Sequence, residues 1–276
     1  MIRDILVHVT PDPASEARVR YAVDLATHHR AQLTGIHVIA PLEVPPVFKP
    51  SRIEAVAREL SAEEAAGAKR AEAQFQQAVG SDVESRWLAP GGDMVRGVCA
   101  HARYADLVLL GHEPTEVALE RRPFDLAEEI VLKSGRPVLV LPDGGAPPPP
   151  AKKALIAWDG RPQAVRAVHD ALPLLVEAEV ALVVVANPEH DHLDPDVVDG
   201  AKLLDHLRRH GVKVESSRTI RLHESDADII LGYFRDQNAD LLVMGGYGRS
   251  PLAEILFGGA SAHLVRETPG ALLISH

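Results

Sequence analysis

Residues 238–245, NADLLVMG, carry the pattern that decides the fold. Ala-Asp is followed by four apolar residues and a glycine, and residues 104–111, YADLVLLG, repeat the arrangement. A short apolar run bounded by turn-forming residues is typical of a strand that is covered on both faces of a parallel sheet. Two copies of one such strand indicate an internal duplication of the chain.

The duplication extends in both directions from this strand. Upstream, DILVHVT at residues 4–10 matches KALIAWD at residues 153–159. Downstream, EIVLKSGRPVLVL at residues 129–141 matches HLVRETPGALLIS at residues 263–275. The matches cover the start, the middle and the end of each copy, so we expect two lobes of similar length and the same fold.

Four consecutive prolines separate the two copies. Such a run cannot form a helix or the centre of a sheet, and it favours an extended, semi-rigid spacer. We therefore expect lobe 1 at residues 1–146, a Pro-rich linker at residues 147–152 and lobe 2 at residues 153–276.

Within each lobe, short apolar runs alternate with helical patterns. The alternation of strand, helix and strand predicts right-handed crossovers and a parallel sheet. We expect an α/β protein with two tandem doubly wound domains, each a five-stranded parallel sheet with helices on both faces. In lobe 2 the expected strands begin at Ala154, Val180, Val212, Asp240 and Ala271.

Composition and charge exclude several classes of protein. The 276-residue chain has a net charge of −10, which disfavours general nucleic-acid binding. Its one cysteine, Cys99, lies in an apolar pattern and is expected to be a buried, inert thiol in a reducing compartment. No apolar run approaches the ~20 residues of a membrane span, and MIRDILVHVT lacks a signal-peptide layout. We expect a cytoplasmic protein without a membrane or nucleic-acid partner.

The glycine-rich stretch at residues 244–261 is the candidate functional site. Ligands of open parallel sheets bind outside the carboxyl ends of the strands, and glycines there allow a ligand to approach the backbone. The stretch runs into a helical pattern at residues 260–267, and the start of a helix attracts anions. The residues that suit a phosphate group are Gly245, Gly248, Arg249, Gly258, Gly259 and Ser261.

The spacing of these glycines fits neither the Walker motif nor the dinucleotide-binding fingerprint. Spacing alone therefore leaves two interpretations open. The stretch forms a phosphate cradle, or it is a flexible loop that ends in a glycine-rich helix cap.

The stretch resembles the signature of the universal stress protein family, in which Gly, two residues, Gly, nine residues and Gly precede a Ser or Thr. Here the glycines are Gly245, Gly248 and Gly258, and Gly259 stands where the family has the hydroxyl residue. Ser261 matches a further small hydroxyl residue of the pattern. The resemblance covers the whole chain as a tandem of two family domains, and it implies the adenine-nucleotide α-hydrolase-like fold.

The resemblance also implies a ligand and a role. Family members of this kind bind ATP or AMP, with Mg²⁺ as a companion ion of ATP, and act in stress resistance without a well-defined reaction. They often form dimers, so the lobes would make an intrachain pseudo-dimer and the chain a homodimer. The implied nucleotide-binding residues of lobe 2 are Trp158, Asp159, Val185, Ala186, Met244, Gly245, Gly248, Arg249, Gly258, Gly259, Ala260 and Ser261.

Lobe 1 departs from the signature at most of the matching positions. A phenylalanine and an aspartate at the expected phosphate positions would block and repel an anion, so we expect no ATP in lobe 1. The departures are Thr10 for Asp159, Pro114 for Gly248, Phe124 and Asp125 for Gly258 and Gly259, and Ala127 for Ser261.

Two rival functions stay open at the level of sequence. A slow ATPase or nucleotidyl-transfer enzyme would need a metal-binding carboxylate near the glycine stretch, where Glu254 is the one acidic residue. A scaffold would bind no nucleotide and use its glycines for packing. A metal site is also conceivable in the loop PEHDHLDPD, with His190, Asp191, His192 and Asp194, although a solvated acidic loop is the better interpretation.

Overall fold

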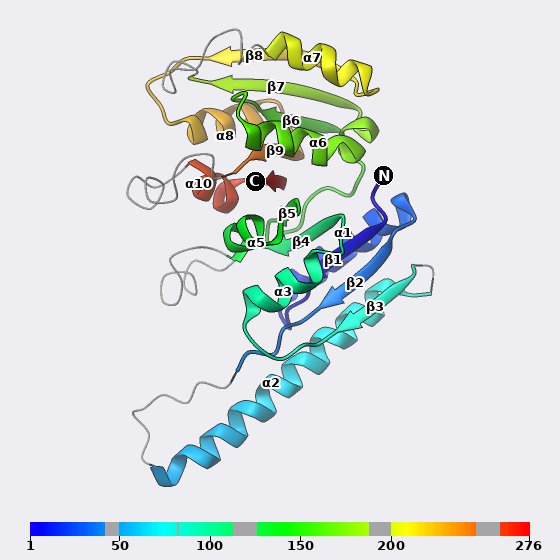
Figure 1. Ribbon diagram of the computed structural model, residues 1–276, viewed down its shortest axis with the longest axis vertical. Helices are drawn as coiled ribbons and strands as arrows, with labels where there is room; N and C mark the ends of the chain where they lie inside the picture. Colours follow the sequence, from blue (N-terminus) through cyan, green and yellow to red (C-terminus); the bar gives the residue numbers. More distant parts are fainter. Residues whose placement is uncertain (42–49, 82, 113–125, 188–199, 247–259) are drawn as a thin grey trace.

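The structure is a computed structural model that describes residues 1–41, 50–81, 83–112, 126–187, 200–246 and 260–276 (Figure 1). Lobe 1 contains β1 (Asp4–His8), α1 (Pro13–His29), β2 (Gln32–Ile36), α2 (Pro50–Val79), β3 (Ser85–Leu88), α3 (Met94–Ala102), β4 (Leu107–Gly111), α5 (Leu126–Ser134) and β5 (Val138–Leu141). Lobe 2 contains β6 (Lys153–Ala157), α6 (Pro162–Glu177), β7 (Val180–Ala186), α7 (Gly200–Arg209), β8 (Val214–Ile220), α8 (Asp226–Asp236), β9 (Leu241–Gly245), α10 (Ala260–Glu267) and β10 (Ala271–Ser275).

The strands form one ten-stranded sheet in the order β3-β2-β1-β4-β5-β10-β9-β6-β7-β8. Within each lobe all neighbouring strands are parallel, so the predicted fold class is confirmed. The lobes meet at β5 and β10, which pair antiparallel with Leu139 opposite Leu273. The two repeats therefore build an intrachain pseudo-dimer through their last strands.

The helices cover both faces of this sheet (Figure 1). On one face α1, α2, α6 and α7 pack against the sheet, and on the other face α3, α5, α8 and α10 do so. Each hydrophobic cluster includes residues from both lobes, because side chains of β5 and β10 alternate between the faces. Leu139 and Leu273 lie in one cluster, and Val140 and Leu272 lie in the other. The two lobes thus share their core.

Local sequence explains where several helices begin and end. Asp12 caps α1 by accepting a hydrogen bond from the Ser15 amide at 3.0 Å, and a proline follows the cap. Gly211 follows α7 with a φ of 84°, a left-handed conformation that favours glycine and stops the helix. The predicted helix at residues 260–267 is α10. Among the described helices, none is long and apolar enough to cross a membrane.

Candidate functional site

The carboxyl ends of β6 and β9 lie side by side in lobe 2. The register places Ala157 opposite Met244, so Asp159 follows one strand and Gly245 ends its neighbour. The chain runs from β6 toward β7 and β8 on one side and returns through β9 and β10 on the other. This reversal of strand order is the switch point at which open α/β sheets bind ligands. The structure thus brings together the Asp and the first glycine of the predicted site.

Asp159 lies in the turn between β6 and α6. Its Oδ1 accepts a hydrogen bond from the Arg161 amide at 3.0 Å, and its Oδ2 lies 3.9 Å from the Arg161 Nε. The side chain is 46% exposed, so the carboxylate remains accessible while the turn fixes its position. A pre-positioned acceptor of this kind suits the hydroxyl groups of a ligand.

Gly245 is in close contact with the first turn of α6. A β-carbon at this position would overlap the backbone of Gln163 and Ala164, so helix and strand can approach only because residue 245 is a glycine. The glycine therefore has a packing function, which is the use that the scaffold alternative gives to the glycines. It also brings the amino end of α6 to the carboxyl end of β9.

The chain after β9 is anchored to the last strand of the sheet. The Gly246 amide donates to the Ser275 carbonyl at 2.8 Å, and a β-carbon on Gly246 would lie 2.5 Å from the Ile274 Cδ1. The predicted residues Gly248, Arg249, Gly258 and Gly259 lie outside the described residues.

The remaining predicted residues fall into two groups. Val185 and Met244 are 3% and 5% exposed, so they belong to the core beneath the strand ends. Ala260 is the exposed first residue of α10, and Ser261 is buried beside it. Ala186, at the end of β7, is half-buried.

Trp158 is half-buried at the end of β6, and its amide donates to the Val184 carbonyl of β7 at 2.9 Å. Its indole Nε1 is buried and has no hydrogen-bond partner among the described residues. A buried donor without a partner costs free energy, so this nitrogen is suited to a polar group of a bound molecule.

Asn187 is a residue of this edge that the sequence analysis missed. It is 1% exposed with a φ of 36°. Its side chain donates to the Glu224 carbonyl and to Asp226 at 3.1 Å, and it accepts from the Leu222 amide at 2.9 Å. These bonds hold the turn before α8 against the end of β7. An asparagine directly after an apolar run, where its side chain tolerates a left-handed turn, was the available signal.

In lobe 1 the equivalent place is filled by Arg18 of α1. The guanidinium donates from Nε to the His8 carbonyl at 2.8 Å and from Nη2 to the Thr10 hydroxyl at 2.7 Å. A β-carbon on Gly111 would overlap its Nη1. The residue at the matching position of α6 is Ala167. The switch point of lobe 1 therefore holds the side chain of Arg18, whereas the matching residue of lobe 2 is too short to reach the same place.

Arg18 also determines the charge of this region of lobe 1. The arginine is 6% exposed, and burial lowers its pKa while Asp12 and Asp143 oppose that change. Burial, the Arg18 charge and His37 together lower the pKa of His8 to about 3. His8 is therefore neutral at pH 7.

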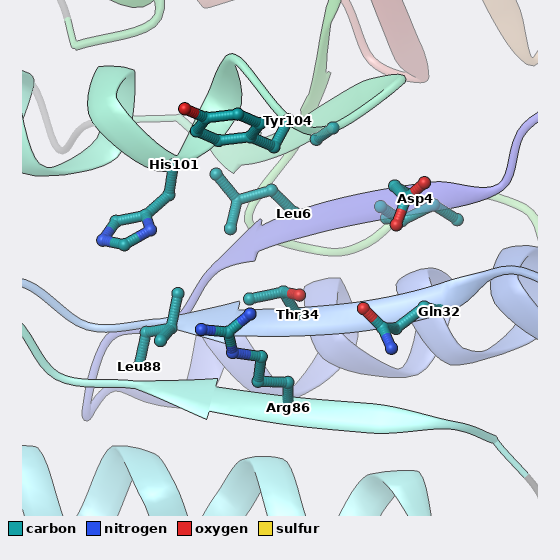
Figure 2. A pocket seen from close by; sticks show the side chains of 10 residues that line it. Asp4, Leu6, Gln32, Thr34, Arg86, Leu88, His101 and Tyr104 are labelled. Atoms are coloured by element: carbon teal, nitrogen blue, oxygen red, sulfur yellow. The ribbon is translucent and has the colours of Figure 1, made fainter.

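A cavity of about 360 Å³ lies in lobe 1, away from the switch point. Figure 2 shows Thr34 and Arg86 on β2 and β3, with His101 and Tyr104 across from them. Asp4, at the amino end of β1, also lines the cavity. The cavity therefore lies toward the amino ends of the strands, whereas the switch point lies at their carboxyl ends. Its lining is mixed and it is open to solvent, and we assign it no function.

Cys99 and the histidines at positions 190 and 192 were the other candidates for reactive or metal-binding groups. Cys99 is 5% exposed, and burial raises the pKa of its thiol, as expected for an inert cysteine. The loop with His190 and His192 lies outside the described residues. Within the described residues, no three His, Cys, Asp or Glu side chains form a ready site for a metal ion.

Comparison with known proteins identifies the family to which both lobes belong. A family model described as the universal stress protein family matches residues 1–142 and again residues 150–276. The chain matches no curated protein. Among solved structures it is similar to a universal stress protein from Archaeoglobus fulgidus DSM 4304, with 16% identity and a TM-score of 0.69 over 99% of this chain and 96% of that one.

Two further structures have the same arrangement over nearly their whole length. A putative universal stress protein from Pseudomonas aeruginosa UCBPP-PA14 has 15% identity and a TM-score of 0.58, over 99% of this chain and 93% of that chain. A protein of unknown function from Pseudomonas aeruginosa PAO1 has 14% identity and a TM-score of 0.60, over 99% and 92%. At these identities the likeness concerns the fold of both lobes together.

Proposed function

Because the chain belongs to the universal stress protein family, in two tandem copies, we propose that it binds an adenine nucleotide, ATP or AMP, in lobe 2 alone. The nucleotide would act by changing the conformation of the protein or its affinity for a partner in the cytoplasmic stress response. A ligand has this effect only when it binds one state more tightly than the other.

The difference between the two switch points carries this proposal. In lobe 1 the Arg18 guanidinium fills the place beside Gly111, whereas the matching residue of lobe 2 is Ala167. Among the described residues, the three atoms nearest to a β-carbon at Gly245 all belong to the backbone of α6 and not to a long side chain. The accessible Asp159 carboxylate lies at the end of the adjacent strand. These features favour lobe 2 as the place for a ligand.

The proposal gives roles to several of the predicted nucleotide-binding residues of lobe 2. Asp159 accepts hydrogen bonds from the nucleoside hydroxyls, and the end of β7 at Val185 and Ala186 lies beside the adenine. The amino end of α10, at Ala260 and Ser261, offers the partial positive charge of a helix start to the phosphates. The remaining phosphate contacts come from Gly248, Arg249, Gly258 and Gly259.

Titration calorimetry with ATP and AMP, with and without Mg²⁺, tests the proposal. We expect one equivalent of nucleotide per chain, and we expect Asp159→Asn to weaken binding at least tenfold, which is about 1.4 kcal/mol. Asp205→Asn is the matched control, because Asp205 is an exposed carboxylate on α7 that pairs with Arg208. An unchanged affinity in Asp159→Asn, two equivalents per chain, or no binding at millimolar nucleotide would overturn the proposal.

A further inference from the structure

Three histidine rings gather on the outside of lobe 2, away from the switch point. His169 projects from α6, His206 projects from α7, and His210 directly follows the last residue of α7. The ring centroids of His206 and His210 are 4.6 Å apart, and that of His169 lies 5.5 Å from His206 and 6.2 Å from His210. We call these residues the three-histidine cluster.

The helix repeat explains why two of these rings lie close together. His206 and His210 are four residues apart, so they lie on the same face of α7 and its end. Leu203 and Leu207 point instead into the core that α7 shares with α6. His169 and His210 are exposed and His206 is half-buried, so the rings are within reach of solutes.

The ring centroids are separated by distances close to those between imidazoles that bind one metal ion. In a tetrahedral zinc site with Zn–N bonds of about 2.0–2.1 Å, the centroids of two imidazole ligands are about 5.3 Å apart. The observed separations of 4.6, 5.5 and 6.2 Å lie within about 1 Å of that value. The described residues form no ready metal site, so the rings must turn for their nitrogens to converge. Exposed side chains make such changes within nanoseconds.

His206 lies nearer to each of the other two rings than those rings lie to each other. Partial burial, the neighbouring rings of His210 and His169, and the Arg209 charge all lower the pKa of His206. The two acidic residues adjacent to the cluster in sequence, Asp170 and Asp205, are paired with Arg166 and Arg208. A donor set of imidazoles suits zinc, nickel or copper and not calcium or magnesium.

We propose that His169, His206 and His210 bind one divalent transition-metal ion, with zinc as the reference metal and water as a fourth ligand. The ion would link α6 to α7 on the outer surface of lobe 2. Arg161 and Asp159 precede α6, but the metal site is separate from them and does not depend on the proposed nucleotide function.

Metal titration of the full chain without a histidine tag tests the proposal. We expect one equivalent of Zn²⁺ by calorimetry and visible absorption bands of tetrahedral Co²⁺ when cobalt is used as the probe. His206→Ala and His169→Ala should each weaken binding at least tenfold and abolish the cobalt bands. His223→Ala, at an exposed histidine after β8, is the matched control and should bind as the wild type does.

Two further variants separate the cluster from other candidate ligands. His190→Ala combined with His192→Ala removes two histidines that lie between β7 and α7 in the sequence. Glu177→Gln removes the carboxylate that lies 3.1 Å from His28 and 3.4 Å from His29. Both variants should keep the metal site. Circular dichroism of each metal-free variant verifies the fold. Unchanged binding in His206→Ala, loss of binding in either of these two variants, or no binding by the wild type would overturn the proposal.

Discussion

The guanidinium of Arg18 occupies the space that a β-carbon on Gly111 would need. Two hydrogen bonds, to the His8 carbonyl and to the Thr10 hydroxyl, hold it there in a buried position. At the matching glycine of lobe 2, Gly245, the space is taken instead by the backbone of α6. The two repeats have thus kept a glycine at the same place for different physical reasons.

Gly245→Ala should destabilise the protein more than Gly111→Ala. The backbone of α6 cannot move without displacing the helix, so we expect a loss of about 3 kcal/mol or more for Gly245→Ala. A side chain yields more easily, and we expect about 1–2 kcal/mol for Gly111→Ala. Urea unfolding measures both changes. In an Arg18→Ala background the cost of Gly111→Ala should fall, and an unchanged cost would contradict the assigned contact.

Ala167→Arg should reproduce the arrangement of lobe 1 in lobe 2. Arg18 reaches His8 and Thr10, whose matches in lobe 2 are Ala157 and Asp159. A guanidinium at the end of β6 would occupy the proposed ligand space beside Asp159, so nucleotide binding should fall below detection in calorimetry. Val165→Arg adds the same charge on the exposed side of α6, where residue 165 is 40% exposed, and should bind normally. Equal nucleotide affinity in the two variants, with both shown to be folded, would mean that this space is not used by the ligand.

The stability of the protein should decrease as the pH falls below about 6.5. Unfolded His8 takes up a proton near its ordinary pKa of 6.5, whereas folded His8 does so only at about pH 3. Between these values the unfolded state binds more protons, so the free energy of unfolding decreases as the pH falls, by up to about 1.4 kcal/mol for each pH unit. Urea unfolding between pH 7.5 and 5 measures this slope.

His8→Phe removes one titrating group while keeping an aromatic ring, and it should reduce the slope with pH. The lowered pKa values of His29 and His206 contribute with the same sign and should leave a smaller slope. His223→Ala should keep the wild-type slope, because His223 lies exposed after β8. Parallel slopes in wild type and His8→Phe would show that His8 does not cause the pH dependence.

The two lobes should unfold together in one cooperative transition. Leu139 and Leu273 face each other across β5 and β10, and both are fully buried in a cluster that includes residues of both lobes. Leu139→Ala should cost about 2–5 kcal/mol and lower the midpoint of the whole transition. Trp87 lies in lobe 1 and Trp158 in lobe 2. In a Trp158→Phe variant the fluorescence reports the unfolding of lobe 1, and in a Trp87→Phe variant it reports the unfolding of lobe 2. Two transitions with only the lobe 1 signal shifted would contradict the shared core.

The sequence by itself determined the repeated unit and its fold class. Buried strands need continuous apolar runs, and surface helices need an apolar stripe, so both leave a local periodic signal. The helix of residues 260–267 and the end of α7 before Gly211 were predictable in this way. The repeat also fixed which residues of the two lobes correspond, including Thr10 and Asp159.

The tertiary structure decided what joins the lobes and what fills each switch point. Pairing of β5 with β10 depends on two strand edges distant in sequence, and edge pairing adds no periodic signal to either strand. In the sequence, nothing distinguishes Arg18 from other residues of a surface helix. Only the fold brings it against Gly111, which lies more than ninety positions away in sequence. The three-histidine cluster likewise arises only when α6 and α7 pack on one face. Contacts between distant segments depend on the path of the backbone, which local patterns do not encode.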